Sequence, residues 1–534
     1  MKKGTKITLI ILAVLFGIAA LIFVGADIAV SRIAQKEVNK ALAEIPGCQA
    51  SCGTIKVRFF SATAQVNDLR FTYHGEPIHA KDTVGPGVDI WVERVDVGRF
   101  FYTKLLKKEV LISSVSIVRP HAEIWLDEEK PESCFPELHD EKLEQADNVL
   151  LRAALNKLKI KNASMRLHSV RTKLDVEVDS CSLTVHDLAY DSTFSYNDSV
   201  YHFSLEYAGV TIPDGQMRIE TSDIHHDNQG ALLLGRTRIR HTMPRKKLGE
   251  MVKEPVTWMD MTIESVQTTP FNPIHKAMAK DFNLEGVKAV VEKMDIFRDE
   301  RFAPKKPFDM PQQILTAIPV VFNLKYADTQ IKKIDIEFAS TDINIGKLQL
   351  KDIQARVDNI TNKRNATMMV KGSCPIEQGQ ALAEMTMTMN KDCEFTTKLH
   401  AVNINADFLN SFVRPLVGIT CECQIDTLDT EYKGNTTIAK GTYRMLYNGL
   451  NVQVHKEDNI PYKIVTNHAK TFTSLANSLI PKSNPTAVDI HPRAYYVEWK
   501  RDEWKPFPLY MFGPCIDGVK MTFLPGLYVH KQVH

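Results

Sequence analysis

The chain has 534 residues, 44% of them hydrophobic and 24% charged, which is typical of a globular protein and excludes a largely disordered one. Its 66 basic and 64 acidic side chains are scattered, so it lacks the concentrated positive charge of a nucleic-acid-binding protein. It also lacks a nucleophile elbow, a zinc-protease helix, a phosphate loop and a dinucleotide turn. We therefore expect a protein that is not an enzyme and uses no cofactor and no nucleic acid.

An apolar run from Ile7 to Ala26 follows lysines near the start of the chain. At the helical rise this run can cross a hydrocarbon core of about 30 Å, and we predict a transmembrane anchor within residues 1–27 whose N-terminus is cytoplasmic. A cleaved secretory signal that ends before Asp27 is the alternative. The large side chains that represent the anchor are Ile7, Leu12, Phe16, Leu21 and Phe23.

Strands are expected next, in two blocks. Residues 28–135 begin with a short helix and continue with apolar residues at every second position, and residues 159–300 repeat this alternation. In VEVDSCSLTVHDL the alternation changes phase once, which predicts a strand with a bulge. One face of that strand carries Val176, Val178, Leu183 and Val185.

Apolar residues at helical spacing predict two amphipathic helices, one near 140–158 within segment 136–158, and one near 469–480 within segment 467–484. The prolines and lysines of segment 301–316 predict a linker between domains. The aromatic tail, residues 485–534, is expected to form a final hairpin on the last sheet, or a tip that faces a membrane or a partner.

A third strand block, residues 317–466, contains the clearest strand, GKLQLKDIQARVDNIT at 346–361. Its alternation also changes phase once, which predicts a bulge or tight bend. The pair Asn448 and Gly449, between two alternating segments, predicts a hairpin. One face of this block carries Leu348, Leu350, Ile353, Val357, Met385, Met387 and Met389.

These elements predict a mainly β fold with a few helices, in which a transmembrane helix leads into a long curled antiparallel sheet that forms a trough or groove. A sandwich or a closed barrel would bury the same faces, and the strand pattern alone does not choose among the three. In the trough, the apolar face is open to an acyl-chain ligand. The candidate lining residues are Val176, Val178, Leu183, Val185, Leu348, Leu350, Ile353, Val357, Met385, Met387 and Met389.

The nine cysteines are an odd number with no zinc-knuckle spacing, so we expect no structural metal, and the disulfide pairing stays open. His225 and His226 lie close to Asp223 and Asp227. Because no second cluster with ligand spacing accompanies them, we interpret this segment as a polar turn between strands.

Several stretches carry a resemblance to a known family. The anchor, VSIVRPHAEIWLDEE at 115–129 and LKIKNASMRL at 158–167 resemble the N-terminal part of AsmA-like proteins, which are anchored in the inner membrane of Gram-negative bacteria and lie in the periplasm. RDERFAPKKPFDMP at 298–311, the strand at 346–361 and FTSLANSLIPKSNP at 472–485 are similar to Bacteroidetes AsmA-like proteins with an uncharacterised C-terminal domain. The family includes the inner-membrane subunit of the translocation and assembly module.

The resemblance implies a non-enzymatic, single-pass inner-membrane protein with its bulk in the periplasm, which binds or conveys phospholipid or another acyl-chain lipid between the inner and outer membranes and supports outer-membrane homeostasis. It also implies an outer-membrane or periplasmic protein partner at the C-terminal end. The alternative is an assembly factor for outer-membrane β-barrel proteins that acts through strand edges and the aromatic tail. The chain is shorter than the largest members, which argues against a complete bridge between the membranes.

Overall fold

The computed structural model describes most of the chain after the predicted anchor. The five anchor residues Ile7, Leu12, Phe16, Leu21 and Phe23 lie outside the described residues, as does segment 135–151 of the helix predicted near 140–158. Within the described part, no helix is long and apolar enough to cross a bilayer. The described ranges are 27–40, 47–77, 84–101, 109–127, 129–134, 152–171, 174–191, 201–212, 217–227, 230–272, 282–318, 321–341, 343–455, 469–487 and 490–533.

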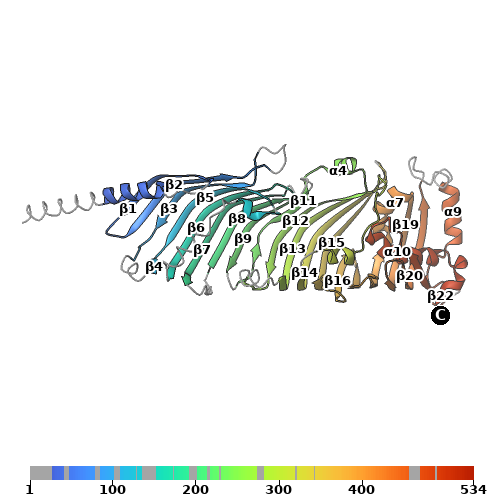
Figure 1. Ribbon diagram of the computed structural model, residues 1–534. Helices are drawn as coiled ribbons and strands as arrows, with labels where there is room; N and C mark the ends of the chain where they lie inside the picture. The colour runs from blue at the N-terminus through green and yellow to red at the C-terminus, as the bar shows by residue number, and fades with distance from the viewer. Residues whose placement is uncertain are drawn as a thin grey trace, which may run out of the picture. The chain divides into compact units, whose positions relative to one another are not determined.

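The fold is mainly β, as predicted, and the chain divides into two compact units, Met1–Gly235 and Arg236–His534 (Figure 1). In the first unit, neighbouring strands follow the order β1, β2, β3, β5, β6, β7, β8, β9. The short β4 pairs with the start of β6, and β10 pairs with β9. Its described strands are β1 (Gln49–Arg58), β2 (Thr63–His74), β3 (Gly87–Val97), β4 (Glu109–Ile112), β5 (Val115–Leu126), β6 (Arg152–Ser169), β7 (Asp175–Asp191), β8 (Tyr201–Thr211), β9 (Met217–Asp227) and β10 (Leu233–Leu234), and Pro131–Cys134 forms the 3-10 helix η1.

The second unit is also built on one sheet, whose strands from β11 to β22 pair in chain order. Its strands are β11 (Thr237–His241), β12 (Val256–Thr268), β13 (Phe282–Asp299), β14 (Phe322–Ala339), β15 (Ile345–Thr361), β16 (Thr367–Ile376), β17 (Gly379–Thr388), β18 (Phe395–Asn405), β19 (Ile419–Gly434), β20 (Ile438–Val454), β21 (Ala494–Lys500) and β22 (Gln532–Val533). Its helices are α4 (Arg245–Val252), α6 (Pro311–Thr316), η3 (Ala406–Leu409), α7 (Asn410–Val417), α9 (Ala469–Leu479), α10 (Phe507–Phe523), η4 (Pro525–Leu527) and η5 (Val529–Lys531).

The sheets are mixed, which corrects the expectation of a purely antiparallel one. β6 runs parallel to β4 and β5, and β14 runs parallel to β13. A parallel pair requires the chain to return to the starting end of the sheet between its two strands, and the sequence leaves long connections after β5 and after β13 for this purpose.

A row of bends crosses the strands of the first unit. Asp68, Arg119, Asn162, Ser180 and Asp223 have φ angles of 48° to 53°, and each lies inside a strand. The pairing registers place Asp68, Glu93 and Arg119 opposite one another, and likewise Ser180, Glu206 and Asp223. In the second unit, Asp352 of β15 has a φ of 54° and lies opposite Lys332. We call these aligned positions the bend row. It confirms the predicted phase changes in the strands of Val176 and Leu348.

A helix over residues 27–40 packs along β1 at the edge of the sheet, and its side chains bind backbone groups of that strand. Asp27, Ser31, Gln35 and Asn39 follow one another at four-residue spacing, and therefore lie along one helix face. The Asp27 carboxylate accepts from the Phe59 amide at 2.8 Å, and the Ser31 hydroxyl accepts from the Val57 amide at 2.8 Å. Gln35 donates to the Gly53 carbonyl at 2.5 Å, and Asn39 accepts from the Cys52 amide at 3.4 Å. These side chains satisfy backbone groups that an edge strand otherwise exposes.

Replacing both Ser31 and Asn39 with alanine should open this edge. Each lost hydrogen bond contributes about 0.5–1.5 kcal/mol, so we expect the amides of Cys52 and Val57 to exchange hydrogen several-fold faster. Hydrogen exchange measured by mass spectrometry checks this expectation. Glu37→Ala, on the exposed side of the same helix, is the control, and equal exchange in all variants contradicts this role of the helix.

Three local predictions were wrong. Residues 152–158, expected to end a helix, form the start of β6, because they pair with β4 on one side and β7 on the other. Asn448 and Gly449 make no hairpin: they lie inside β20, where Gly449 (φ 69°) and Leu450 together face Cys423 and form a bulge. Segment 485–534 contains β21 and α10 in place of a hairpin.

Segment 301–316, predicted to be a linker between domains, lies inside the second unit. Met310 is fully buried, and the Arg501 guanidinium donates to the Phe308 carbonyl at 2.5 Å. The helix predicted near 469–480 is confirmed as α9. α9 packs on β20, and α10 packs on β20 and β21, so these helices cover one face at the end of the sheet (Figure 1).

Candidate functional site

One face of the first unit's sheet is apolar across its strands. Val178 lies between Met165 of β6 and Ala208 of β8, and Leu183 lies between Ile160 and Phe203. Val176, Val178, Leu183 and Val185 are all half-buried. The described elements that pack against β7 are its strand neighbours β6 and β8. The predicted residues of this block therefore share one half-open surface.

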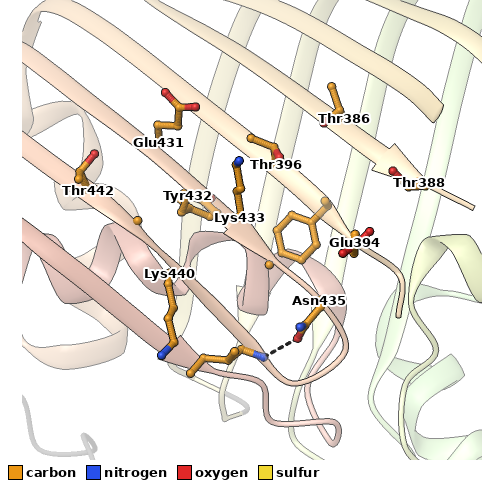
Figure 2. A pocket seen from close by; sticks show the side chains of 14 residues that line it. Thr386, Thr388, Glu394, Thr396, Glu431, Tyr432, Lys433, Asn435, Lys440 and Thr442 are labelled. Carbon is orange, nitrogen blue, oxygen red and sulfur yellow. Dashed lines mark hydrogen bonds between the residues drawn. The ribbon is translucent and has the colours of Figure 1, made fainter. Parts of the chain in front are cut away.

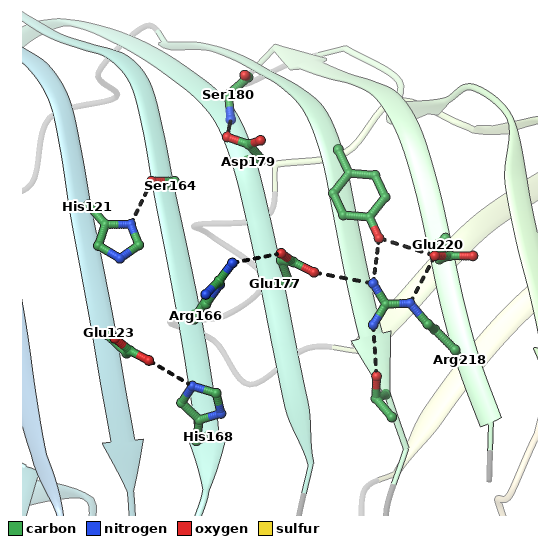
Figure 3. Close-up of polar contacts among 12 residues, drawn as sticks. His121, Glu123, Ser164, Arg166, His168, Glu177, Asp179, Ser180, Arg218 and Glu220 are labelled. Carbon is green, nitrogen blue, oxygen red and sulfur yellow. Dashed lines mark hydrogen bonds and ion pairs between the residues drawn. The ribbon is translucent and has the colours of Figure 1, made fainter. Parts of the chain in front are cut away.

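The opposite face of the same sheet is polar and internally paired. In Figure 3, Arg218 of β9 donates to Tyr207 at 2.7 Å, to Glu220 at 2.9 Å and to Glu177 at 3.3 Å. The hydrogen bond with Glu220 is the largest cause that raises the pKa of Arg218 above its usual range. His168 bridges Glu123 and Asp175 on the two neighbouring strands. Cross-strand pairs of this kind stabilise a sheet face that is exposed to solvent. The apolar face is different, because the aliphatic side chains of β7 on that face are only half-buried and cannot form polar pairs.

The second unit repeats the arrangement in β11–β15. Leu348, Leu350 and Ile353 lie directly opposite Ile336, Ile334 and Ile331 of β14, and Val357 lies opposite Ala327. All four predicted residues of β15 are half-buried. β14 packs against β13 and β15, and α7 additionally covers the start of β15, where the Phe338 and Phe412 rings are 6.2 Å apart. The apolar face is therefore covered by α7 at the start of β15, and at its end Val357 and Ile360 pack against the core around Met310, whereas Leu350 and Ile353 lie between these covers.

Three side chains next to the bend row show how the open face is shaped. Val92, Leu205 and Val291 are 6%, 6% and 3% exposed, whereas the residues two positions before them, Ile90, Phe203 and Ala289, are half-buried. Further from the bend row, Val88, Tyr201 and Phe297 of the same strands are buried as well. Because the described elements against β8 are β7 and β9, a covering helix does not explain the burial of Leu205. A sheet that bends toward its apolar face accounts for the pattern, since side chains at the inside of a bend are shielded by both arms.

All three residues of the methionine run contact one core cluster of the second unit. Met385 is half-buried, but Met387 and Met389 are 4% and 1% exposed, so they do not line an open surface as predicted. They pack in a core with Met310, with Phe395 of β18 and with Tyr510 of α10, and the last two rings are 5.7 Å apart. The strand pattern could not reveal this cover, because Met310 and Tyr510 come from distant segments.

A hollow of about 810 Å³ lies on the polar face of β17–β20 (Figure 2). Lys433 and Lys440 lie directly opposite each other there, and Lys440 contacts Glu498 at 3.0 Å. The side chains that Figure 2 labels in this hollow are those of Thr386, Thr388, Glu394, Thr396, Glu431, Tyr432, Lys433, Asn435, Lys440 and Thr442. Its lining has no Ser, Cys or His, so the usual nucleophile and base pair is not assembled in it.

The described residues contain no group of His, Cys, Asp and Glu that could hold a metal ion. His226 is buried and its Nδ1 lies 2.9 Å from the Tyr201 hydroxyl, while Asp227 pairs with His202. His225 and His226 belong to strand β9 and not to a turn, which corrects that interpretation.

Burial also suppresses cysteine reactivity at the end of the sheet. It raises the pKa of Cys515 to about 11 and that of Cys423 to about 12. These groups are therefore thiols at neutral pH, whereas nucleophilic attack requires the thiolate.

The ion pair of Asp260 and Arg238, on β12 and β11, predicts an acid sensitivity. Arg238 donates to both carboxylate oxygens, at 2.9 and 2.6 Å, and these bonds lower the pKa of Asp260. The stabilisation is present above the pKa of an unpaired Asp, about 3.9, and is lost as pH falls through the lowered value. Denaturant midpoints measured from about pH 6 down to about pH 3 should fall less in Asp260→Asn than in the parent chain. Arg238→Gln, which removes the same ion pair from the other side, should also reduce the fall at low pH, and a fall equal to that of the parent chain in both variants contradicts this origin.

No model of a known protein family and no curated protein matches this chain.

Proposed function

We propose that the protein is a non-enzymatic, AsmA-like, single-pass protein of the inner membrane, whose periplasmic part is a long curled trough that holds or conveys phospholipid between the inner and outer membranes. The observation that carries this proposal is the apolar face of β1–β9 and β11–β15. Aliphatic rows cross it in register, and Val178, Leu183, Leu350 and Ile353 are among its half-buried side chains, although polar networks complete the opposite face.

Two physical arguments support an acyl-chain occupant. An apolar surface that extends over many strands exceeds what a soluble protein normally leaves in water, and such surfaces mark binding sites. Five neighbouring strands, spaced by about 4.8 Å, span about 19 Å. The hydrocarbon core of a bilayer is about 30 Å thick, and acyl chains from each side fill half of it, so this span is longer than the thickness that one acyl chain fills. An acyl chain can therefore lie across several strands and contact aliphatic side chains along its whole length.

The direct test is the lipid content of the protein. The full chain is purified in mild detergent, extracted, and its lipids are identified by mass spectrometry, and uptake of a fluorescent phospholipid is measured in parallel. We expect copurifying phospholipid and saturable uptake. A preparation that contains no lipid and takes up none overturns the proposal.

The alternative, an assembly factor for outer-membrane β-barrel proteins, makes a different prediction in the same preparation: a crosslinked barrel protein and no bound lipid. Deleting 485–534 is unsuitable for this comparison, because Tyr495, Val497 and Met521 belong to the core that this deletion removes. Substitutions of exposed side chains keep the fold and separate the two functions.

A further inference from the structure

We propose that the outer surface of the α9–α10 layer docks on a bilayer that contains anionic phospholipid. We call this surface the docking face. It consists of exposed side chains of α9, α10 and the turn after α10: Lys470, Leu475, Leu479, Lys482, Leu509, Phe512, Ile516, Lys520, Leu524, Leu527 and Val529. The inference goes beyond lipid holding, because it names the surface at which the protein meets a membrane.

The first argument comes from α10, which is apolar on both of its faces. Its inner face buries Tyr510, Gly513, Gly518 and Met521 against the sheet. Its outer face exposes Leu509, Phe512 and Ile516, which are 36%, 49% and 44% exposed and follow helical spacing. A helix of a soluble protein usually carries polar residues on its solvent side, so the outer face of α10 is suited to an apolar environment.

The second argument is that other segments extend the same surface. α9 and α10 pack on one core cluster that contains Tyr443, Tyr447 and Tyr495, so their outer faces point away from the same side of the sheet. On α9, Leu475 and Leu479 are 48% and 65% exposed. After α10, Leu527 and Val529 are 69% and 63% exposed. Large apolar side chains thus gather on one layer rather than being scattered.

Charge identifies the partner as a bilayer with anionic headgroups. Residues 469–534 contain eight Lys and Arg (470, 482, 493, 500, 501, 505, 520, 531) and five Asp and Glu (489, 498, 502, 503, 517), a net charge of +3 in a chain whose total is +2. Lys470 and Lys482 lie at the two ends of the α9 stripe, and Lys520, whose ammonium lies 5.4 Å from the centre of the Trp499 ring, follows Ile516 in the α10 stripe. Apolar side chains beside lysines are typical of helices that lie in a membrane interface, where each lysine attracts anionic lipid.

The test uses the full chain and vesicles of phosphatidylcholine and phosphatidylglycerol that carry a photoreactive phospholipid. After illumination, lipid adducts are mapped to peptides by mass spectrometry. We expect adducts on Phe512, Ile516 and Leu527, and at least about tenfold fewer in the double variant Phe512→Ser/Ile516→Ser, because two large side chains no longer leave water. Because the readout is local, binding through the N-terminal segment does not affect it.

Val321→Ser/Ile343→Ser is the matched control, since these side chains are 62% and 63% exposed elsewhere in the second unit. In this control variant, the photoreactive lipid should label α10 as strongly as in the parent chain. Replacing Lys470, Lys482 and Lys520 with glutamine, or omitting phosphatidylglycerol, should reduce the adducts several-fold. The proposal fails if α10 stays unlabelled, if the control and the double variant behave alike, or if lipid preloaded on the protein labels the docking face without vesicles. Labelling confined to β7 and β15 would reject docking while supporting lipid holding.

Discussion

Leu350→Glu is expected to deprive the protein of copurifying phospholipid while the second unit stays folded. Leu350 is half-buried on the open face, opposite Ile334 of β14. A carboxylate at this position must either lose its hydration against an acyl chain or exclude the chain. We expect at least about a tenfold fall in the lipid-to-protein ratio measured by mass spectrometry.

Gln354→Glu is the control for this charge. Gln354 is exposed and lies on the polar face of the same strand, four positions after Leu350. The substitution therefore introduces the same carboxylate without placing it on the apolar face. Its lipid content should equal that of the parent chain, and circular dichroism should show all variants folded. Equal lipid loss in both variants would mean that lipid does not occupy the apolar face.

Gly518→Ala is expected to destabilise the second unit strongly. A Cβ atom at Gly518 of α10 would lie 2.1 Å from Cγ of Tyr443, a side chain with no exposed surface. α10 must then move away from β20, and Met521 and Tyr447 lose contacts in the same core. Overpacking of a filled core typically lowers the free energy of unfolding by about 1–3 kcal/mol, and we expect a loss in the upper part of this range. A lower midpoint in denaturant-induced unfolding would measure this loss.

Gly526→Ala is the matched control, because a Cβ atom at Gly526 meets no other atom within 4 Å. It lies three residues after α10 and should leave the midpoint unchanged. If Gly518→Ala also unfolds like the parent chain, α10 is not held against β20 as described, and the burial of Met387 under the same layer would need another explanation.

The strand faces could be predicted from the sequence because they depend on local alternation. In β7 and β15 the apolar residues change phase at Ser180 and Asp352, and both residues have a left-handed backbone that bends the strand. Polar residues with short side chains tolerate this conformation, so a polar residue at a phase change is a usable signal for a bend.

The covering layer could not be predicted in the same way. The buried positions of α10 include Gly513 and Gly518, and its exposed positions include Phe512 and Ile516, which reverses the usual helical pattern. Periodicity therefore gave no helix signal there. The bulge at Gly449 shows a second limit, since an Asn-Gly pair suits both a hairpin turn and a bulge, and only the pairing of β20 with its neighbours decides between them.

The bend row has a consequence for how such a sheet can change in length. Several strands of the first unit carry a bend residue of their own, and strand pairing brings Ser180 of β7 level with Asp223 of β9, although β8 between them has no left-handed residue. The bend residues of a duplicated hairpin would lie at the same register position as those of the original hairpin. The deletion of one residue within a strand would instead shift its bend out of register with the bends of both neighbouring strands. Proteins built in this way can therefore grow or shrink by whole strand pairs, and hairpin duplication is the natural route by which their reach evolves.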